Sequence, residues 1–555
     1  MAGRAVGNLS RSVHLGIHFS LGGEQAEADP LLQQAFFESG HYSAIASKDD
    51  PRCFIVGRTG SGKSALLQRI EERHPDHVIR INPEDLSLPY IADLGVVTYL
   101  ASLDVHLDPF FIALWKHVIL IEIIKHRYKV DSPAAKQNFL VSLRDKIARD
   151  RSKLAALDYL EEFEGKFWCE TDERVRDITT RFEEQIKNEA GGKIRAATVG
   201  EVSGKITSSG TAGEETTRQL VERFQRVVNE TQLPRLNKMM TVLNDEILDS
   251  SQHYTYIVID DLDRDWVDVK VLNSLIRCLF RTVVDLKRVQ NLKVLVALRT
   301  NIFEQLNFGS RTGGQEEKFR SLTLHVRWVR NELEHLLDLR ARVAAQHHGL
   351  EGMRGVSDML PKSNKERGNP ISFILRHTLM RPRDVLAFIN ECLALTTGKR
   401  RIAWAEINGA ELPYSRNRLL ALRDEWKPSY PNIDRLFQLF KSAPVTISRD
   451  GLLRILGDAA LLPADPGFSG ARWLTELSAQ VWNGLEGDDW IVQYQSMIEF
   501  LFHVGFLGCI SPGGTAIYSH EQPELVSQAS NLAEIEEFCV HPAFRAALDI
   551  QEVRD

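Results

Sequence analysis

The chain is poor in the features that mark several classes of protein. Its 555 residues hold six scattered cysteines, with no Cys-x-x-Cys pair, which argues against a zinc site or a disulfide framework and favours a reducing cytosol. The first residues lack the apolar core of a signal peptide. The most apolar stretch, 110–124, is interrupted by charges and is too short to span a membrane. We therefore expect a soluble cytoplasmic protein with no membrane contact, and we interpret 110–124 as a core helix.

An excess of positive charge is also missing. The net charge is −7 and the isoelectric point is about 6.2. Composition therefore does not indicate a surface that is positively charged throughout and binds nucleic acid. A local basic face for nucleic acid stays possible, but we disfavour it as the main partner. The length is too great for a single core, and we expect roughly two to four domains.

What the chain does have is a glycine-rich loop between an apolar run at 53–56 and a helical pattern from residue 64. The segment Gly57-Arg-Thr-Gly-Ser-Gly-Lys63-Ser64 is a complete P-loop, G-x-x-x-x-G-K-S. Glycines let backbone N–H groups close around phosphate oxygens, and the start of a helix adds a favourable partial charge. We predict that Lys63 contacts the β- and γ-phosphates of ATP and that the Ser64 hydroxyl binds Mg²⁺. The predicted nucleotide-binding residues are Gly57, Arg58, Thr59, Gly60, Ser61, Gly62, Lys63, Ser64 and Ala65.

A second phosphate-site pattern follows at 254–264, where an apolar run ends in Asp260-Asp261-Leu-Asp-Arg264. This pattern predicts a parallel core strand with its carboxylates at the ligand edge, as in a Walker B motif. We expect Asp260 to hold the metal and Asp261 to orient or deprotonate the attacking water. A core strand that happens to end in two capping aspartates is the alternative.

Two further patterns supply candidate polar groups. The strand predicted at 292–298 is followed by Arg299, Thr300 and Asn301. Asn301 or Thr300 is a candidate sensor of the γ-phosphate and Arg299 is a candidate for acting on a neighbouring subunit's nucleotide, unless they simply cap the next turn. At 381–390, Arg381 and Arg383 flank a proline at a predicted helix start, where they either reach phosphate from a lid or are solvated.

The patterns divide the chain into an α/β protein with several parts. We predict an N-terminal segment at 1–50, a P-loop NTPase core with a parallel sheet at 51–100 and 245–330, a helical insertion at 101–244 and a helical lid at 331–410. Residues 411–555 predict a winged-helix-like α+β domain, because a helix, a strand, a Gly-Gly turn and a second strand follow each other at 495–518. Almost no Lys or Arg lies near this turn, which disfavours direct DNA reading.

The order of these motifs resembles the STAND and KAP-type bacterial P-loop ATPases, which are related to the AAA+ class, and more distantly the origin-recognition initiators. The Asp-Asp-Leu-Asp-Arg string at 260–264 and the Arg-Pro-Arg-Asp string at 381–384 carry the resemblance. Such ATPases are often encoded beside an effector in antiphage defence loci. The chain departs from KAP-type proteins in lacking membrane spans in its insertion and from STAND proteins in lacking a C-terminal repeat array. It also lacks a recognisable effector motif, so an effector is expected on a separate chain.

We accordingly predict an ATPase with slow turnover that uses ATP and Mg²⁺ as a switch, assembles as a homo-oligomer and controls an effector in antiphage defence. The alternative is a DNA-dependent remodelling or loading ATPase that contacts DNA through the C-terminal domain. A scaffold with a degenerate pocket is a third class, which the intact motif residues disfavour.

Overall fold

The computed structural model forms two compact units. The sheet unit comprises Gly40–Val56 and Leu66–His325, and the C-terminal unit comprises Met1–Ser39, Gly57–Ala65 and Val326–Asp555. Most of the predicted insertion, and Asp263 and Arg264, lie outside the described residues. The structure describes residues 15, 18–82, 107–129, 133–149, 154, 157, 158, 161, 162, 233–262, 269–306, 316–350, 352–396, 398–468, 472–484 and 489–550.

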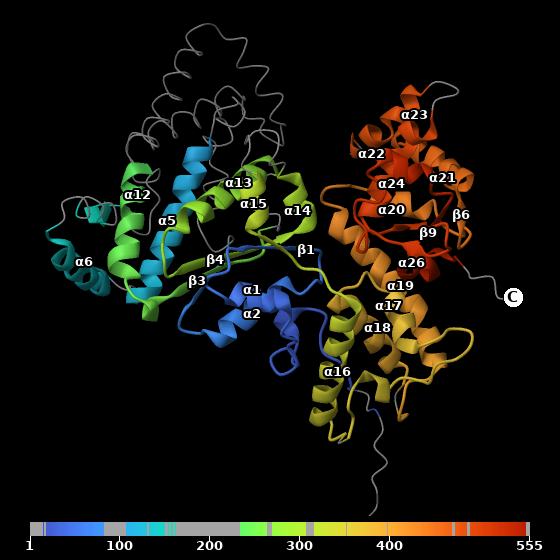
Figure 1. The fold of residues 1–555 in the computed structure, drawn as a ribbon, viewed down its shortest axis with the longest axis horizontal. Helices are drawn as coiled ribbons and strands as arrows, with labels where there is room; N and C mark the ends of the chain where they lie inside the picture. Colours follow the sequence, from blue (N-terminus) through green and yellow to red (C-terminus); the bar gives the residue numbers. More distant parts are fainter. Residues whose placement is uncertain are drawn as a thin grey trace, which may run out of the picture. The chain divides into compact units, whose positions relative to one another are not determined.

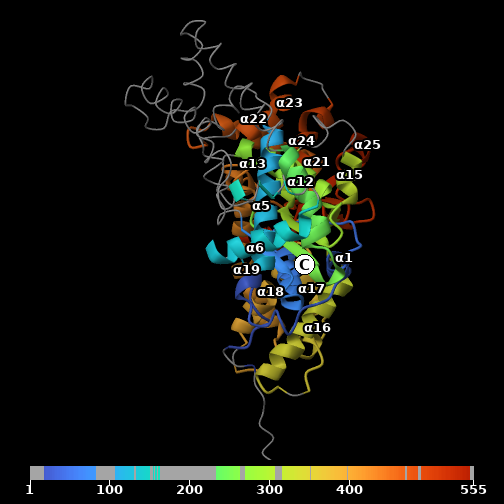
Figure 2. The same cartoon turned by 90° about the vertical axis from the view of Figure 1, so that its left-hand side faces the viewer.

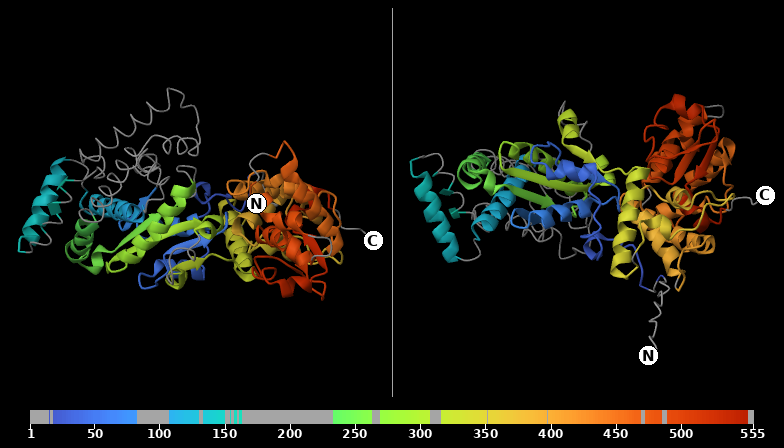
Figure 3. Two further views of the ribbon diagram at one scale, coloured as in Figure 1. Left: turned by 90° about the horizontal axis from the view of Figure 1, so that it is seen from above. Right: turned by 60° about the horizontal axis from the view of Figure 1, so that its bottom comes forward.

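The sheet unit is built around a parallel sheet, seen from above in Figure 3. Its strand order is β2-β3-β4-β1-β5. Ile257 of β3 pairs with Val294 of β4 and with Ile79 of β2, and Phe54 of β1 pairs with Thr323 of β5. The strands are short apolar runs rich in β-branched residues, as expected for strands buried on both faces. Their bounds are Phe54–Gly57 (β1), Val78–Ile81 (β2), Thr255–Ile259 (β3), Leu292–Arg299 (β4) and Thr323–His325 (β5).

Helices cover both faces of this sheet, with α1 and α2 on one side and α5 and α13 on the other (Figure 1). Tyr256 of β3 donates its hydroxyl hydrogen to the carbonyl of Ala46 at the end of α1. The helices are α1 (Gly40–Ala46), α2 (Lys63–Arg73), α5 (Asp108–Tyr128), α6 (Pro133–Ile147), α12 (Leu233–Val242), α13 (Val269–Leu286), α14 (Thr300–Gln305) and α15 (Glu316–Ser321). A π-helical turn (Leu243–Ile247) and a 3₁₀ turn (Ser251–His253) lead from α12 into β3.

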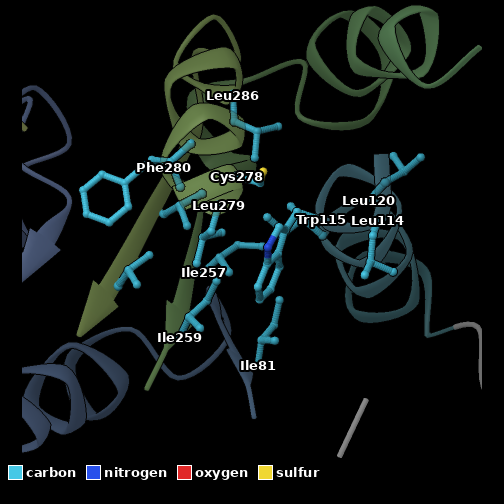
Figure 4. Close-up of a cluster of buried hydrophobic side chains, with 14 of the residues drawn as sticks. Ile81, Leu114, Trp115, Leu120, Ile257, Ile259, Cys278, Leu279, Phe280 and Leu286 are labelled. Carbon is cyan, nitrogen blue, oxygen red and sulfur yellow. The ribbon is translucent and has the colours of Figure 1, made fainter. Parts of the chain in front are cut away.

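Helix α5 is the apolar segment that the sequence predicts as a core helix, and the structure confirms this interpretation. Trp115 is fully buried, and its indole N–H donates to the carbonyl of Leu275 on α13 at 2.9 Å. Its ring points toward Ile257 and Ile259 of β3 (Figure 4). Among the residues that the structure describes, no helix combines the length and the hydropathy that crossing a membrane requires.

The first part of the C-terminal unit is helical and has its own core. Helices α16 (Arg330–His347), α17 (Pro370–Arg376) and α18 (Pro382–Ala394) pack with the first half of α19 (Trp404–Trp426). Leu21 lies in the same core, and its backbone N–H donates to Asn390 of α18. The structure thus confirms that the region predicted as a helical lid at 331–410 is helical and that a helix begins beside Arg381.

The last part of the C-terminal unit adds a small antiparallel sheet of order β6-β9-β7-β8 (Figure 2 shows the helices around it). The predicted helix, strand, turn and strand at 495–518 are present, and Cys509 pairs with Ile517 across the turn. The elements are α20 (Ile433–Gln438), β6 (Ile447–Ser448), α21 (Arg449–Leu461), α22 (Arg472–Leu477), α23 (Ala479–Asn483), α24 (Trp490–His503), β7 (Leu507–Ile510), β8 (Ala516–Ile517), α25 (Ala529–Ala533), β9 (Glu537–Val540) and α26 (Pro542–Arg545).

Two predicted domain boundaries differ from this organisation. The boundary between 331–410 and 411–555 falls inside α19, which continues from Trp404 to Trp426. Residues 57–65, which the sequence groups with the sheet, belong to the C-terminal unit. Both differences have the same physical cause. Helix α19 and the loop at 57–65 make their contacts with residues distant in sequence, and boundaries drawn from local patterns do not take such contacts into account.

Candidate functional site

The glycine-rich loop leaves β1 at Gly57 and enters α2 at Lys63. Gly60 and Gly62 have φ values of +78° and +96°, which only glycine adopts without strain. A Cβ at Gly57 would lie 2.5 Å from the Ser61 hydroxyl oxygen. The loop therefore needs glycine at these three positions, as the motif predicts.

Hydrogen bonds from two side chains fix the shape of this loop. The indole N–H of Trp328 donates to the carbonyl of Ser61 at 2.8 Å. The Lys63 ammonium group donates to the carbonyls of Gly57 and Arg58 at 2.9 and 3.2 Å. Two of the Lys63 acceptors are thus neutral carbonyls, which an anion could replace.

The loop also carries buried polar atoms whose partners are missing. The hydroxyl oxygens of Thr59 and Ser61 are buried and find no hydrogen-bond partner among the described residues. An unsatisfied buried hydroxyl is costly, and it commonly marks the place of a ligand, ion or water. This observation and the glycine cradle both fit a phosphate group held by the loop.

The acidic pair lies at the carboxyl end of β3. Asp260 is buried, and its carboxylate accepts the backbone N–H of Asp261 at 3.0 Å. Arg80, on the neighbouring strand β2, has a guanidinium nitrogen 4.0 Å from the same carboxylate. Asp261 has a φ of 57°, a left-handed conformation that aspartate tolerates better than most residues. An unusual backbone conformation held next to a buried carboxylate is typical of a functional site.

The third group of candidates lies at the end of β4. This strand lies between β3 and β1, and the backbone N–H of Val296 donates to the carbonyl of Cys53. Parallel strands end at the same edge of a sheet, so Arg299, which ends β4, is flanked by the ends of β3 and β1. Thr300 begins α14, and Asn301 is buried in its first turn. The predicted strand-end residues thus share one edge of the sheet.

Arg381, the residue before α18, lies against the glycine-rich loop but contacts protein acceptors. Its guanidinium donates to both carboxylate oxygens of Asp384, to the carbonyl of Thr59 at 2.9 Å and to Glu425 at 3.1 Å. Burial by itself would lower the pKa of Arg381, but Asp384 and Glu425 raise it overall. In this structure Arg381 therefore ties the loop to α18 and α19.

Arg383, the first of the two lid candidates, packs its side chain over Gly60. A Cβ at Gly60 would lie 2.7 Å from the Arg383 Cβ. The Arg383 side chain donates to the carbonyl of Glu24 at 3.0 Å. Burial, with the nearby charge of Arg381, lowers the pKa of Arg383. The close approach of Arg383 to the backbone of Gly60 is thus a second reason for glycine at this position.

Glu425, near the end of α19, is a loop-binding residue that the sequence does not predict. One carboxylate oxygen accepts the Thr59 backbone N–H at 3.1 Å and the Arg58 Nε–H at 3.2 Å. The other accepts Arg58 Nη2 and Arg381 Nη1, each at 3.1 Å. Burial would raise the pKa of Glu425, but Arg58 and Arg381 overcome burial and lower it to about 2. Glu425 is therefore a buried carboxylate held ionised by two arginines.

Two further groups extend this network away from the loop. Asp384 is fully buried, and besides Arg381 it accepts Arg418 Nη1 at 3.1 Å. Arg418 also pairs with the Glu24 carboxylate at 2.9 Å. Arg381 and Arg418 hold the pKa of Asp384 below its usual value although burial opposes them. We call Glu24, Arg58, Arg381, Asp384, Arg418 and Glu425 the loop network.

The loop network also reaches the last part of the C-terminal unit through Arg58. The Arg58 guanidinium lies 5.9 Å from the Trp426 ring centre. Gly505, at the end of α24, has a φ of +81°, and a Cβ there would lie 2.6 Å from Arg58 Nη1. The second residue of the loop thus packs directly against the turn between α24 and β7.

Comparison with known proteins gives two matches. Residues 331–423 match the model of the FunZ-associated C-terminal helical domain, which agrees with the helical region α16–α19. The chain is also 23% identical over 447 residues, or 76% of its length, to the transposon gamma-delta 80.3 kDa protein of Escherichia coli (strain K12). The match covers 53% of that protein, so the chain spans about half the length of this curated relative. Neither description names an ATPase.

Proposed function

We propose that the chain is an ATP-binding switch of the P-loop class, with slow hydrolysis, that controls a partner protein. The observation that carries the proposal is the loop at 57–64. It combines glycines at positive φ, unsatisfied hydroxyls and a lysine that donates to two backbone carbonyls. Arg58 within it belongs to the loop network, and the backbone of Thr59 is bonded to Glu425 and Arg381 of that network. A loop that can bind phosphate and is bonded to distant helices can pass its state on to them.

The residues would divide the work as follows. Lys63 exchanges the carbonyls of Gly57 and Arg58 for the β- and γ-phosphates, a charge-assisted contact that is stronger than the ones it leaves. Ser64 and Asp260 supply oxygen ligands for Mg²⁺, which neutralises developing charge on the phosphates. Asp261 accepts a proton from the attacking water or orients that water.

The remaining candidates have supporting roles in this proposal. Asn301 at the end of β4 senses the γ-phosphate, and Arg299 acts on the nucleotide of a neighbouring subunit in a homo-oligomer. Arg383 reaches phosphate once it leaves the carbonyl of Glu24, whereas Arg381 holds the loop. These roles follow the resemblance to AAA+-related ATPases of the STAND and KAP type.

The experiment that tests the proposal is a titration of purified protein with ATP and Mg²⁺ by calorimetry. The Lys63→Ala change should weaken ATP binding by about tenfold to a hundredfold, the value of one charge-assisted contact. Lys287→Ala, which removes a lysine from the exposed end of α13, should bind like the parent protein. Equal ATP affinity in the parent and the Lys63 variant would refute the assignment of residues 57–64 as a nucleotide-binding loop.

The switch itself requires a second measurement, the mass in solution without nucleotide, with ADP and with a non-hydrolysable ATP analogue. A change of assembly between these conditions is the expected result. The resemblance implies antiphage defence with a separate effector chain as the setting. Equal plating of phage on cells with and without the locus would contradict that setting.

A DNA-dependent remodelling ATPase is the second candidate. The name of the transposon gamma-delta relative favours it, and so does the winged-helix-like order of α24, β7 and β8. DNA should then stimulate hydrolysis, and the effect should fall steeply with salt. An unchanged turnover rate with DNA would leave the switch as the better proposal.

A further inference from the structure

Two segments of the C-terminal unit carry a local excess of positive charge. Residues 352–367 follow α16, and residues 398–406 lead from α18 into α19. Together they contain seven basic residues and three acidic ones, in a chain whose net charge is −7. We call the exposed side chains of Arg354, Lys362, Lys365, Arg400 and Arg401 the basic surface.

Backbone and side-chain bonds hold the two segments side by side. The N–H of Ile402 donates to the carbonyl of Met359 at 2.8 Å. The indole N–H of Trp404 donates to the carbonyl of Lys362 at 2.9 Å. The two segments that carry the basic surface are therefore joined, and they form the yellow and orange loops beside α17 and α18 (Figure 1).

The nearby carboxylates offset only part of this charge, although Glu366 is exposed between Lys365 and Arg367. Glu406 is buried, where it accepts the Ala403 N–H and pairs with Lys399, and Glu411 pairs with Arg367. Asp358 accepts the backbone N–H of Arg354. Within the described part of the chain, no ion pair occupies any of the five side chains of the basic surface. Exposed cations this close repel one another, and a polyanion removes that cost.

An aromatic ring lies beside these charges. Trp404 is half-buried, and its ring meets Phe373 edge-on, with 5.7 Å between ring centres. The Arg367 guanidinium covers the same Phe373 ring at 5.0 Å. A partly exposed aromatic ring among lysines and arginines is the combination that contacts nucleic-acid backbones and bases.

We propose that the basic surface binds the phosphodiester backbone of nucleic acid, mainly through charge. The centre of an interface with a folded protein is usually depleted in charged residues, whereas this surface is defined by exposed cations. The proposal differs from DNA reading by β7 and β8, because residues 507–518 contain no Lys or Arg. It explains how an acidic protein can hold nucleic acid, and it does not depend on nucleotide binding at residues 57–64.

The test is fluorescence anisotropy of a labelled duplex DNA of about 30 base pairs, with single-stranded DNA and RNA in parallel arms, in protein without nucleotide. Five phosphate contacts predict a slope of log affinity against log salt of about −4.5. The variant Lys365→Gln/Arg400→Gln/Arg401→Gln should weaken binding by about tenfold or more at low salt and flatten that slope by about 2.7.

The matched control removes the same charge elsewhere in the C-terminal unit. Lys427→Gln/Arg454→Gln/Arg472→Gln changes three exposed basic residues outside the two segments and should keep the parent affinity. Melting temperatures of both variants check that each is folded.

Loss in the first variant alone supports the proposal, and the arm with the highest affinity identifies the nucleic acid. Equal loss in both variants, no binding in any arm, or equal binding to polyglutamate and anionic vesicles would overturn it. The Lys63→Ala protein should bind DNA like the parent, so this result and the nucleotide assignment can fail separately.

Discussion

The change Glu425→Gln removes one negative charge from the centre of the loop network and keeps the shape of the side chain. The pKa of Glu425 is about 2, against 4.5 for an ordinary glutamate. A difference of this size corresponds to about 3 kcal/mol of stability at neutral pH, since each pKa unit is worth about 1.4 kcal/mol. Removing one partner of a buried ion pair costs a similar amount, about 3–5 kcal/mol.

The assay is differential scanning calorimetry of the parent protein and the variant at pH 7. For the C-terminal unit of about 280 residues, about 3 kcal/mol lowers the melting temperature by roughly 5 °C. The neighbouring change Asp424→Asn is the matched control. Its side chain is 61% exposed and pairs with Arg423, so it should cost less than about 1 kcal/mol.

A pH series gives the prediction a second, independent test. Because folding lowers the pKa of Glu425, its contribution is complete above about pH 4.5 and is lost as the pH falls toward 2. The difference between parent and variant should be constant from pH 8 to about pH 5 and then shrink. A Glu425→Gln protein as stable as the Asp424→Asn control at pH 7 would refute the account of the loop network.

Two other changes have definite expected outcomes. Asp261→Asn should keep nucleotide affinity within about twofold, because asparagine tolerates the left-handed backbone at 261. The same change should slow single-turnover hydrolysis by about 10²-fold or more. Lost binding would instead assign Asp261 to holding the metal. Gly508→Ala should lower the calorimetric stability by about 1–3 kcal/mol, because a Cβ there would overlap the Tyr518 ring, whereas Gly513→Ala in the same hairpin meets only ordinary contacts. Equal melting temperatures for the two glycine variants would contradict this.

Local patterns predict the strands and the loop from the sequence. The loop requires a positive φ at positions 60 and 62, which favours glycine there. The strands before Asp260 and Arg299 are buried on both faces, which favours apolar residues in them. These signals depend on a few consecutive residues. For that reason the sequence is sufficient to find them.

The loop network could not be predicted in this way, because its contacts join residues far apart in the chain. Arg58 and Glu425 are separated by 367 positions, and no local pattern specifies such a pair. The proline at the helix start after Arg381 predicts that this arginine reaches phosphate from a lid, whereas the structure gives it acceptors in Asp384, Thr59 and Glu425. The net charge of the chain is a poor guide to nucleic-acid binding for a related reason. It sums all charges, so the local excess of positive charge on the basic surface does not show in it.

Helix α19 is one long helix with a proline, Pro413, in its interior. Its first half lies in the core of α16–α18, and its last turn carries Glu425 and Trp426 at the glycine-rich loop. Over 23 residues, or about 34 Å, a tilt of about 5° moves one end by about 3 Å. Pro413 has no N–H for the carbonyl of Gly409, so bending is easiest there. Glu425 lies about 18 Å beyond Pro413, so a displacement of the loop by about 1 Å would tilt the last part of α19 by about 3°.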